Sequence, residues 1–333
     1  MRTNILIGIL WFMAFLLAGC SEDSKNKILM PNVNGRMSDI TIIMTDAYWN
    51  SQAGDTLSGM LQQAFPYLPQ AEPMFSVTRF NPQAFTDIVK RSRTILQVII
   101  SPGIDKSKIT IKEDVWAKPQ LLVIMESADE KSFISMIEKH GSKILETLNK
   151  SERKRVMENN FKYEEKPLRA KVSIKHNAEV TFPNGFKLKT DTTNFTWASL
   201  ESPETSQGIF VYDYPYTDTL QLRPENLIKM RDSLLRKFVP GPMPKSFMRT
   251  EPMVDPGFKE FYLDSAYTAE IRGLWSVKND FMGGPFVSLT QIDVKNSRIV
   301  TVEGYIYAPR FDKRNYVRQV EAIVYSMKIA KPK

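Results

Sequence analysis

Strand-like and helix-like segments alternate along this chain in two batches, and their order constrains the fold more than any single residue does. In the first batch, short β-rich runs are separated by segments whose apolar residues recur every three or four positions. The predicted strands are residues 40–45, 75–80, 94–100, 109–115 and 121–125. The predicted helices are residues 55–65, residues 82–90 and one that begins in a capping box at Ser127-Ala128-Asp129-Glu130.

The second batch has more strands and a helix at its end. Its predicted strands are residues 179–186, the region around Phe195 and Trp197, and residues 209–214, 269–277, 286–293 and 298–308. One helix starts near Pro167, and another starts at Pro224 and ends before Val239-Pro240-Gly241-Pro242, which cannot continue a helix. The last helix, residues 312–328, is predicted to bury Val317, Val320, Val324 and Met327.

A highly charged stretch, residues 150–166, separates the two batches, and we place the division between two halves there. The predicted organisation is a signal segment (1–19), a tether (20–38), an N-terminal half (39–165) and a C-terminal half (166–330). The predicted fold class is α+β, with two α/β sandwich-like halves whose mainly antiparallel sheets are flanked by helices. A hydrophobic content of 42% and a charged content of 25% are typical of a globular protein.

The N-terminus carries an apolar run from Ile5 to Ala18 behind the basic Arg2. The run is too short to span a bilayer and ends in small residues, which predicts a cleaved signal. Its last residues, Leu17, Ala18, Gly19 and Cys20, resemble the lipobox of bacterial lipoproteins. The resemblance implies that signal peptidase recognises Leu17-Ala18-Gly19 and cuts before Cys20, which then carries lipid.

Cys20 is the only cysteine of the chain, so it has no disulfide partner and lipidation is its natural use. An ordinary secretory signal with an unrelated cysteine, or a short anchor helix, is the alternative. The acidic pair Glu22-Asp23 resembles the surface-export signal of lipoproteins in the Bacteroidota, although polar linkers also carry such residues. The prediction is therefore an outer-membrane lipoprotein, with the periplasmic face and the cell surface both open.

The element order of the second half, with strands on either side of one helix and a closing helix, resembles the sandwich fold of the Mog1/PsbP-like proteins. The likeness also includes the entry Pro183-Asn184-Gly185-Phe186 and covers roughly residues 178–330. It implies a fold and no catalytic residues.

Two short sequences in the second half are unusual, namely Arg272-Gly273-Leu274-Trp275 and Met282-Gly283-Gly284-Pro285-Phe286. With them, the chain resembles a Bacteroidota family of uncharacterised lipoproteins, a domain of unknown function. The resemblance implies lipidation and an envelope location, and it implies no reaction.

Several residues of the second half are candidates for binding. Gly283-Gly284-Pro285 is typical of a tight turn, or it holds backbone amides open for an anion or a carbonyl group. Arg272 and Trp275 lie on opposite faces of their strand, so Trp275 is predicted in the core, and Arg272 pairs with Asp280 or Asp232 or clamps a ligand. The basic residues around the start of the last helix oppose its dipole and indicate an acidic partner. The candidate binding residues are Arg272, Asp280, Gly283, Gly284, Arg310, Lys313 and Arg314.

Motifs for familiar chemistry are missing from the sequence. It contains no nucleophile elbow, phosphate loop, dinucleotide fingerprint or zinc-binding His-Glu-x-x-His, so we expect no cofactor. The two histidines, His140 and His176, lack metal-ligand spacing, so no metal is expected, and His140 is predicted to be packed. A carboxylate pair for glycoside cleavage has no spacing signature, which leaves Glu201, Asp213, Glu270 and Glu303 as guesses.

Asp-Thr and Asp-Ser dipeptides recur along the chain, and with the residues that follow them they resemble the Bacteroidota protein O-glycosylation motif. Asp-Thr and Asp-Ser also occur at helix N-caps and in turns. We predict a sugar on at least one of Thr192, Thr219 and Ser265.

The net charge of +8 becomes +7 once Arg2 leaves with the signal segment. Because the chain is predicted to be exported, no nucleic-acid partner is expected in spite of the basic charge. The expected partners are the membrane, through Cys20, and an envelope protein, anionic lipid or glycan. Two functions stay open. One is a non-enzymatic binding or assembly lipoprotein, which the missing motifs favour. The other is an envelope glycan or peptide hydrolase with unidentified carboxylates. Oligomeric state does not follow from the sequence.

Overall fold

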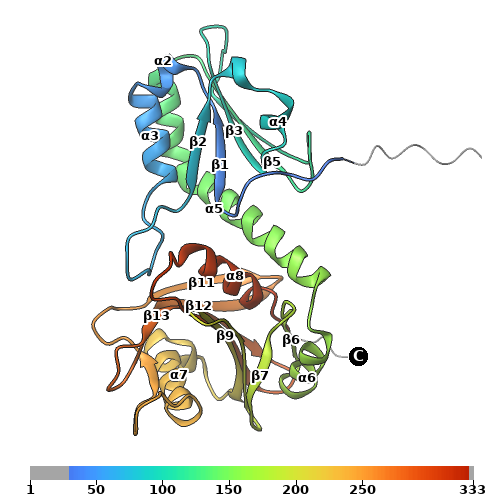
Figure 1. The fold of residues 1–333 in the computed structure, drawn as a ribbon, viewed down its shortest axis with the longest axis vertical. Helices are drawn as coiled ribbons and strands as arrows, with labels where there is room; N and C mark the ends of the chain where they lie inside the picture. Colours follow the sequence, from blue (N-terminus) through green and yellow to red (C-terminus); the bar gives the residue numbers. More distant parts are fainter. Residues whose placement is uncertain (1–29, 330–333) are drawn as a thin grey trace, which may run out of the picture.

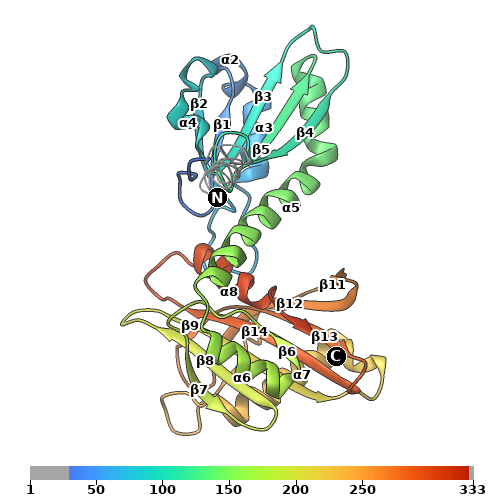
Figure 2. The same ribbon diagram turned by 90° about the vertical axis from the view of Figure 1, so that its right-hand side faces the viewer.

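The computed structural model describes residues 30–329 (Figure 1). The predicted signal segment, its lipobox, Cys20 and the first part of the tether lie outside these residues. Among the described residues, no helix combines the length and the apolar character needed to cross a membrane. Two sheets follow one another along the long axis, and helix α5 (Glu130–Lys162) runs from the first towards the second (Figures 1 and 2).

The first sheet has five strands in the order β2-β1-β3-β5-β4. The strands are β1 (Asp39–Ile43), β2 (Ser76–Phe80), β3 (Thr94–Ile100), β4 (Lys108–Glu113) and β5 (Leu121–Ser127). Beside α5, the helices are α2 (Asp46–Trp49), α3 (Gln52–Leu61), the 3-10 turn η1 (Pro82–Ala84) and α4 (Asp87–Lys90). Strands β2, β1, β3 and β5 are parallel, because helical crossovers join β1 to β2 and β2 to β3. The short connection to β5 makes β4 antiparallel.

Both faces of this sheet are covered. Helices α3 and α5 pack on one face through residues such as Leu57, Phe133 and Ile137. Ile43, Ile95 and Leu122 pack on the other face beside Phe85 and Trp116. A parallel strand that is buried on both faces has apolar residues at consecutive positions. This explains the unbroken apolar run at residues 121–125, which lies in β5.

Two local predictions in this half are wrong. Residues 82–90 are not one helix, because Phe85 separates η1 from α4 and packs edge-on against Trp116 with ring centroids 5.3 Å apart. The expected capping box does not form either. Asp129 is the cap of α5 and accepts from the Ser132 amide at 2.8 Å, whereas the Glu130 carboxylate accepts from the Ala53 amide of α3 at 3.0 Å.

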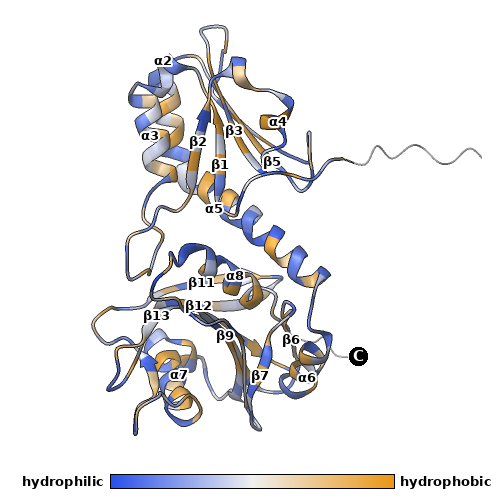
Figure 3. Cartoon of the chain, in the orientation of Figure 1, coloured by the Kyte–Doolittle hydropathy of each residue, from blue (hydrophilic) through white to orange (hydrophobic). Residues whose placement is uncertain are grey.

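The charged stretch 150–166 is helical over most of its length, since α5 continues to Lys162. The helix is largely hydrophilic where it passes between the two sheets (Figure 3). Its charged side chains are not all in solvent, because Glu152 and Arg155 are buried there. Pro167 lies in the first turn of the next helix, α6 (Lys166–His176), as predicted.

The second sheet is antiparallel throughout, in the order β10-β12-β13-β14-β9-β8-β7, with β11 also paired to β12. Its strands are β7 (Lys187–Asp191), β8 (Phe195–Glu201), β9 (Ser206–Pro215), β10 (Met248–Thr250), β11 (Gly257–Leu263), β12 (Ala266–Val277), β13 (Gly283–Asp293) and β14 (Arg298–Tyr307). Its helices, beside α6, are η2 (Thr219–Leu222), α7 (Pro224–Phe238) and α8 (Arg314–Val324). Strands β6 (Ala178–Glu179) and β15 (Lys328–Ile329) pair separately.

This sheet also carries a core on each face. Helices α6 and α8 cover one face, where Val320 and Val324 pack against β14 over Gly304. Helix α7 covers the other face, where Leu235 joins a cluster that includes Trp275 and Tyr305. Trp275 is therefore a core residue, as predicted, and only 2% of it is exposed.

The predicted fold class is confirmed: the protein is α+β, most strand pairs are antiparallel, and helices flank the sheets. The first sheet, in which only β4 is antiparallel, is the exception to the expected pairing. Strands β10 and β11 were not predicted. The expected strand at 179–186, which was predicted to break at a turn and resume, is present only as β6 at its start and as β7 after its end, and Val180 and Phe182 lie buried in the connection between them.

Candidate functional site

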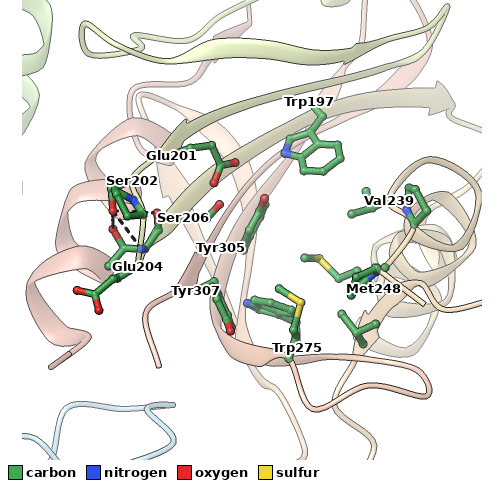
Figure 4. A pocket seen from close by; sticks show the side chains of 17 residues that line it. Trp197, Glu201, Ser202, Glu204, Ser206, Val239, Met248, Trp275, Tyr305 and Tyr307 are labelled. Carbon is green, nitrogen blue, oxygen red and sulfur yellow. Dashed lines mark hydrogen bonds between the residues drawn. The ribbon is translucent and has the colours of Figure 1, made fainter. Parts of the chain in front are cut away.

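An aromatic cleft of about 360 Å³ opens at one end of the second sheet (Figure 4). Its walls come from β8, β12, β14, the loop between β8 and β9, and the segment after α7. The lining residues that matter here are Trp197, Glu201, Met248, Trp275, Tyr305 and Tyr307. We refer to this site as the aromatic cleft.

The floor of the cleft is rigid. The ring of Trp275 meets Tyr305 edge-on with centroids 5.6 Å apart, and its Nε1 donates to the Ile306 carbonyl at 3.2 Å. Tyr305 in turn stacks on Phe210 at 5.1 Å. Its ring lies directly over Gly208, where an added Cβ would overlap it. A side chain at position 208 would therefore push Tyr305 into the cleft.

The rim is formed by two turns. Between β8 and β9, the Ser202 hydroxyl accepts from the Thr205 amide at 3.1 Å, which closes a tight loop. Opposite, Pro240-Gly241-Pro242 ends α7, as the sequence predicts. A Cβ on Gly241 would overlap Ser246 and Val277, so this segment can lie against them only with glycine at that position.

Polar and apolar groups are separated within the aromatic cleft. Figure 4 shows the Glu201 carboxylate, the Tyr305 hydroxyl and the Trp197 nitrogen on one side, with Val239 and Met248 on the other. Trp197 Nε1 is buried and makes no hydrogen bond. Burial raises the pKa of Tyr305, although Ser206 and the nearby Trp197 nitrogen lower it in part, so this phenol stays protonated at neutral pH.

Two carboxylates border the aromatic cleft, and only one turns towards it. Glu201 is half-exposed, and its nearest cation is Lys189, whose Nζ lies 3.7 Å from the carboxylate. Glu204 points away from the aromatic side chains and pairs with Arg310 at 3.0 Å (Figure 4). The cleft therefore offers one accessible carboxylate rather than a facing pair.

The predicted binding residues separate into two groups. Gly283 and Gly284 follow the cleft residue Met282. The predicted tight turn at these residues is wrong, because they begin β13 and pair with β12, and a Cβ on Gly284 would overlap the Ile306 carbonyl of β14. Asp280 forms the turn before them, because its carboxylate accepts from the Phe281 amide at 2.6 Å. With Arg310 on the rim, these four residues lie at or near the aromatic cleft. Arg272, Lys313 and Arg314 lie elsewhere.

Arg272 lies on the opposite face of β12, in a buried network that we call the seam. The seam joins α5, the loop before β2, β12 and α8. Its members are Glu72, Asn149, Arg153, Glu270, Arg272, Arg318 and Glu321. The expected pairing of Arg272 with Asp280 or Asp232 is wrong, since its guanidinium binds Glu270 and Glu321, both at 2.8 Å. Asp232 is instead bonded to Arg231 and Thr250.

Glu321 receives two arginines in the seam, Arg272 and, at 2.6 Å, Arg153 of α5. Burial alone would raise the pKa of Glu321, but Arg272, Arg153 and Arg318 lower it to about 2. Arg318 extends the contact between the halves, donating to Asn149 at 2.8 Å and to the Met74 carbonyl at 3.0 Å.

The basic start of α8 has its acidic partner within the chain. The Glu72 carboxylate accepts from the backbone amides of Lys313 at 2.6 Å and Arg314 at 2.8 Å. It thereby caps the helix from another part of the sequence. Lys313 Nζ donates to Gln70 at 2.8 Å, and the Lys313 side chain is buried. These two cations hold the halves together and are not exposed for a partner.

The carboxylates guessed for a hydrolase do not converge. Glu303 is fully buried against Arg231 at 2.7 Å, and burial raises its pKa although Arg231 opposes the shift. Glu270 belongs to the seam, and Asp213 binds Arg298 at 3.3 Å. Glu201 alone reaches the aromatic cleft.

His176 is the centre of the arrangement that most resembles a catalytic triad. Its Nδ1 lies 2.5 Å from Asp213, and its Nε2 lies 2.8 Å from the Thr196 hydroxyl. His176 and Thr196 are both buried, and neither lines the aromatic cleft. No group of three or more metal-ligand side chains occurs within residues 30–329. This histidine therefore links α6 to the sheet as a structural residue.

A wider groove of about 910 Å³ lies between β4 and α5. Its floor includes the half-exposed Ile111, and its rim is basic. The rim lysines are Lys106, Lys131, Lys139 and Lys143. His140 also lines this groove and is exposed, so its predicted packing is wrong: it lies beside Ile137 and Ile144, at the edge of the buried face of α5, where the groove opens to solvent.

The three predicted glycosylation sites differ in accessibility. Thr219 starts η2 and is exposed, and Ser265 is exposed at the turn between β11 and β12. The Thr192 hydroxyl donates to the Phe195 carbonyl at 3.2 Å and is therefore the least available of the three.

Trp197 was predicted to lie in a strand but was not predicted as a binding residue. The usable signal was its spacing of two residues from Phe195, which predicts that the two side chains point to the same face of β8, and both do belong to the core cluster under α7. Tyr305 and Tyr307 stand out as members of an aromatic-rich half, but their position beside Trp275 depends on the pairing of β12, β13 and β14.

Comparison with protein families matches both halves of the chain. Residues 33–161 match the model described as Domain of unknown function (DUF8532), and residues 165–326 match the one described as Domain of unknown function (DUF4837). No curated protein matches the chain. Each half is thus similar to a family described as a domain of unknown function, in agreement with the predicted likeness to such a domain, and neither description names an activity.

Proposed function

We propose that this protein is an exported, lipid-anchored component of the bacterial cell envelope that binds another envelope component in its aromatic cleft without converting it chemically. The observation that carries the binding role is the aromatic cleft itself, which has aromatic walls, an unpaired indole donor and one inward carboxylate. Paired carboxylates or an activated nucleophile would be needed for hydrolysis, and the cleft residues provide neither.

The lipid anchor rests on the sequence Leu17-Ala18-Gly19-Cys20 and on Cys20 being the only cysteine. We propose an outer-membrane location of the kind used by Bacteroidota lipoproteins, with the periplasmic face and the cell surface as the two possible orientations. A Mog1/PsbP-like sandwich for the second half belongs to the same proposal and is supported by its antiparallel sheet covered by helices.

Intact mass tests the anchor. Protein purified from membranes is expected to lack residues 1–19 and to carry added acyl mass, whereas a Cys20→Ser variant, which has lost the residue before which the peptidase cuts, carries no acyl mass. A further increase in hexose-sized steps is expected from sugar on Thr219, Ser265 or Thr192. Wild-type mass equal to the unmodified polypeptide contradicts the anchor, and mass equal to lipid plus polypeptide contradicts the glycosylation.

Co-sedimentation tests binding against hydrolysis. Purified full-length protein is mixed with detergent-washed, insoluble envelope material, and bound protein, released reducing ends and released amino groups are measured. We expect binding by the wild type, at least tenfold weaker binding by Trp197→Ala, and no released fragments. Fragments that disappear with Glu201→Gln would make the protein a hydrolase. Equal sedimentation of wild type and Trp197→Ala would remove the cleft from the binding role.

A further inference from the structure

We propose that the ligand of the aromatic cleft is a neutral saccharide, held with a sugar ring between the aromatic side chains and a hydroxyl group between Trp197 and Glu201. This inference rests on the proposed function of the cleft as a binding site. Its volume of about 360 Å³ lies within the range of about 300–1,000 Å³ of small-molecule sites.

The first support is the pairing of polar groups. Trp197 Nε1 can only donate, and it is buried without an acceptor. The Glu201 carboxylate can only accept when ionised, and it lies on the same side of the cleft (Figure 4). A sugar hydroxyl is both donor and acceptor, so one such group satisfies both residues.

The second support is the shape of the remaining wall. Opposite the polar side lie Val239 and Met248, and the floor presents aromatic side chains (Figure 4). A pyranose ring is amphiphilic in the same way, with C–H groups on its faces and hydroxyls around its edge. Its faces can cover apolar wall while its edge meets the polar groups, so desolvation leaves few polar atoms unpaired.

The charges favour a neutral ligand. Glu204 is neutralised by Arg310, and Glu201 lies near Lys189. No lysine, arginine or histidine is among the residues that line the described cleft, and Lys189 and Arg310 at its border each lie beside a carboxylate, so an anion would find no free cation among them. A quaternary ammonium group suits aromatic walls but carries no acceptor, so it would leave Trp197 Nε1 unpaired.

A peptide fits less well. Extended peptides bind by adding a strand to a free sheet edge. Strands β8 and β14 each have a hydrogen-bonded neighbour on both edges. Strand β12 pairs with β13 on one edge and with β10 and β11 on the other, so none of the three offers a free edge. The loop at Ser202–Thr205 and the segment Pro240–Pro242 also border the site, so its walls provide no long open groove.

The test uses full-length protein from membranes, held in detergent. Tryptophan fluorescence and calorimetry are recorded against three probes: a panel of neutral oligosaccharides built from hexose, pentose and N-acetylhexosamine units, neutral hexapeptides that include proline-rich ones, and phosphatidylglycerol dispersed in the same detergent. We expect saturable binding of at least one oligosaccharide and none of the other probes. Trp197→Phe, which keeps an aromatic face but loses the donor, should weaken that binding about tenfold, as should Glu201→Gln.

Glu204→Gln is the matched control, because this carboxylate faces away from the cleft, and it should bind sugar within twofold of the wild type. Peptide binding that depends on Trp197, with no sugar binding, overturns the saccharide inference and leaves the cleft as a binding site. Binding of no probe overturns both proposals. Sugar binding unchanged in Trp197→Phe and Glu201→Gln overturns the assignment of the saccharide to this cleft.

Discussion

Strand β12 presents two very different environments on its two faces. On one face, Arg272 enters the seam, where Glu270 and Glu321 neutralise it and contacts with α5 hold the two halves together. On the other face, Trp275 forms the floor of the aromatic cleft, where Trp197 Nε1 and the half-exposed Glu201 are not fully paired. Most groups of the seam pair with one another, although Arg318 Nε has no partner there, so the cleft differs in keeping its unpaired groups beside an open space.

The largest effect is expected from breaking the seam. Arg272→Ala leaves Glu270 and Glu321 buried with less counter-charge, so the free energy of unfolding should fall by about 3–5 kcal/mol. Urea unfolding measures the loss. Arg310→Ala is the matched control, because the Arg310 side chain is 79% exposed, and it should cost less than about 0.5 kcal/mol. Equal losses in the two variants would contradict a structural role for the seam.

Acid should weaken the same network. The pKa of Glu321 is lowered to about 2 in the folded protein, below its ordinary value of about 4.5. Its ionised form therefore adds stability above pH 4.5 that is lost as the pH falls towards 2, a loss of roughly 3 kcal/mol. Urea unfolding from pH 6 to pH 2 checks the sign: Glu321→Gln should show a flatter profile than the wild type. Parallel profiles would mean that Glu321 is not held ionised.

The cap on α8 should have a smaller effect. Glu72→Ala removes the acceptor for the Lys313 and Arg314 amides, which should cost about 1–2 kcal/mol. Hydrogen exchange of these two amides should accelerate, and the melting temperature should fall. Glu204→Ala is the control for removing a carboxylate at the surface. Unchanged exchange in Glu72→Ala would show that the helix start does not depend on the other half.

The smallest effect on stability is expected from changing Trp197 in the aromatic cleft. Trp275, which lies in the core under the cleft, provides a direct comparison. Trp275→Phe loses the bond from Nε1 to the Ile306 carbonyl as well as core contacts, and should cost at least about 1 kcal/mol. Trp197→Phe loses a nitrogen without a partner, so it should cost less than about 0.5 kcal/mol. Chemical unfolding compares the pair. A cost for Trp197→Phe equal to that for Trp275→Phe would show that its nitrogen already has a structural role.

Local sequence patterns predicted the elements they alone control. The α+β class, the end of α7 at Pro240, the buried face of α8 and the core position of Trp275 follow from periodicity, proline geometry and strand alternation. Patterns that depend on partners distant in sequence were less informative. Phe85 breaks a predicted helix because Trp116 packs against it, and Glu130 caps α3 rather than its own helix.

The sequence by itself determined most of the elements and the opposite faces of Arg272 and Trp275, because these depend on residues close together along the chain, and the prediction of export rests on the sequence alone. Only the tertiary structure decided that Glu72 caps α8, that Glu321 receives arginines from both halves, and that Trp197, Glu201 and Tyr305 border one cleft. These contacts join residues far apart in sequence. They form only when strand order and helix packing bring the segments together, and no local spacing encodes that order.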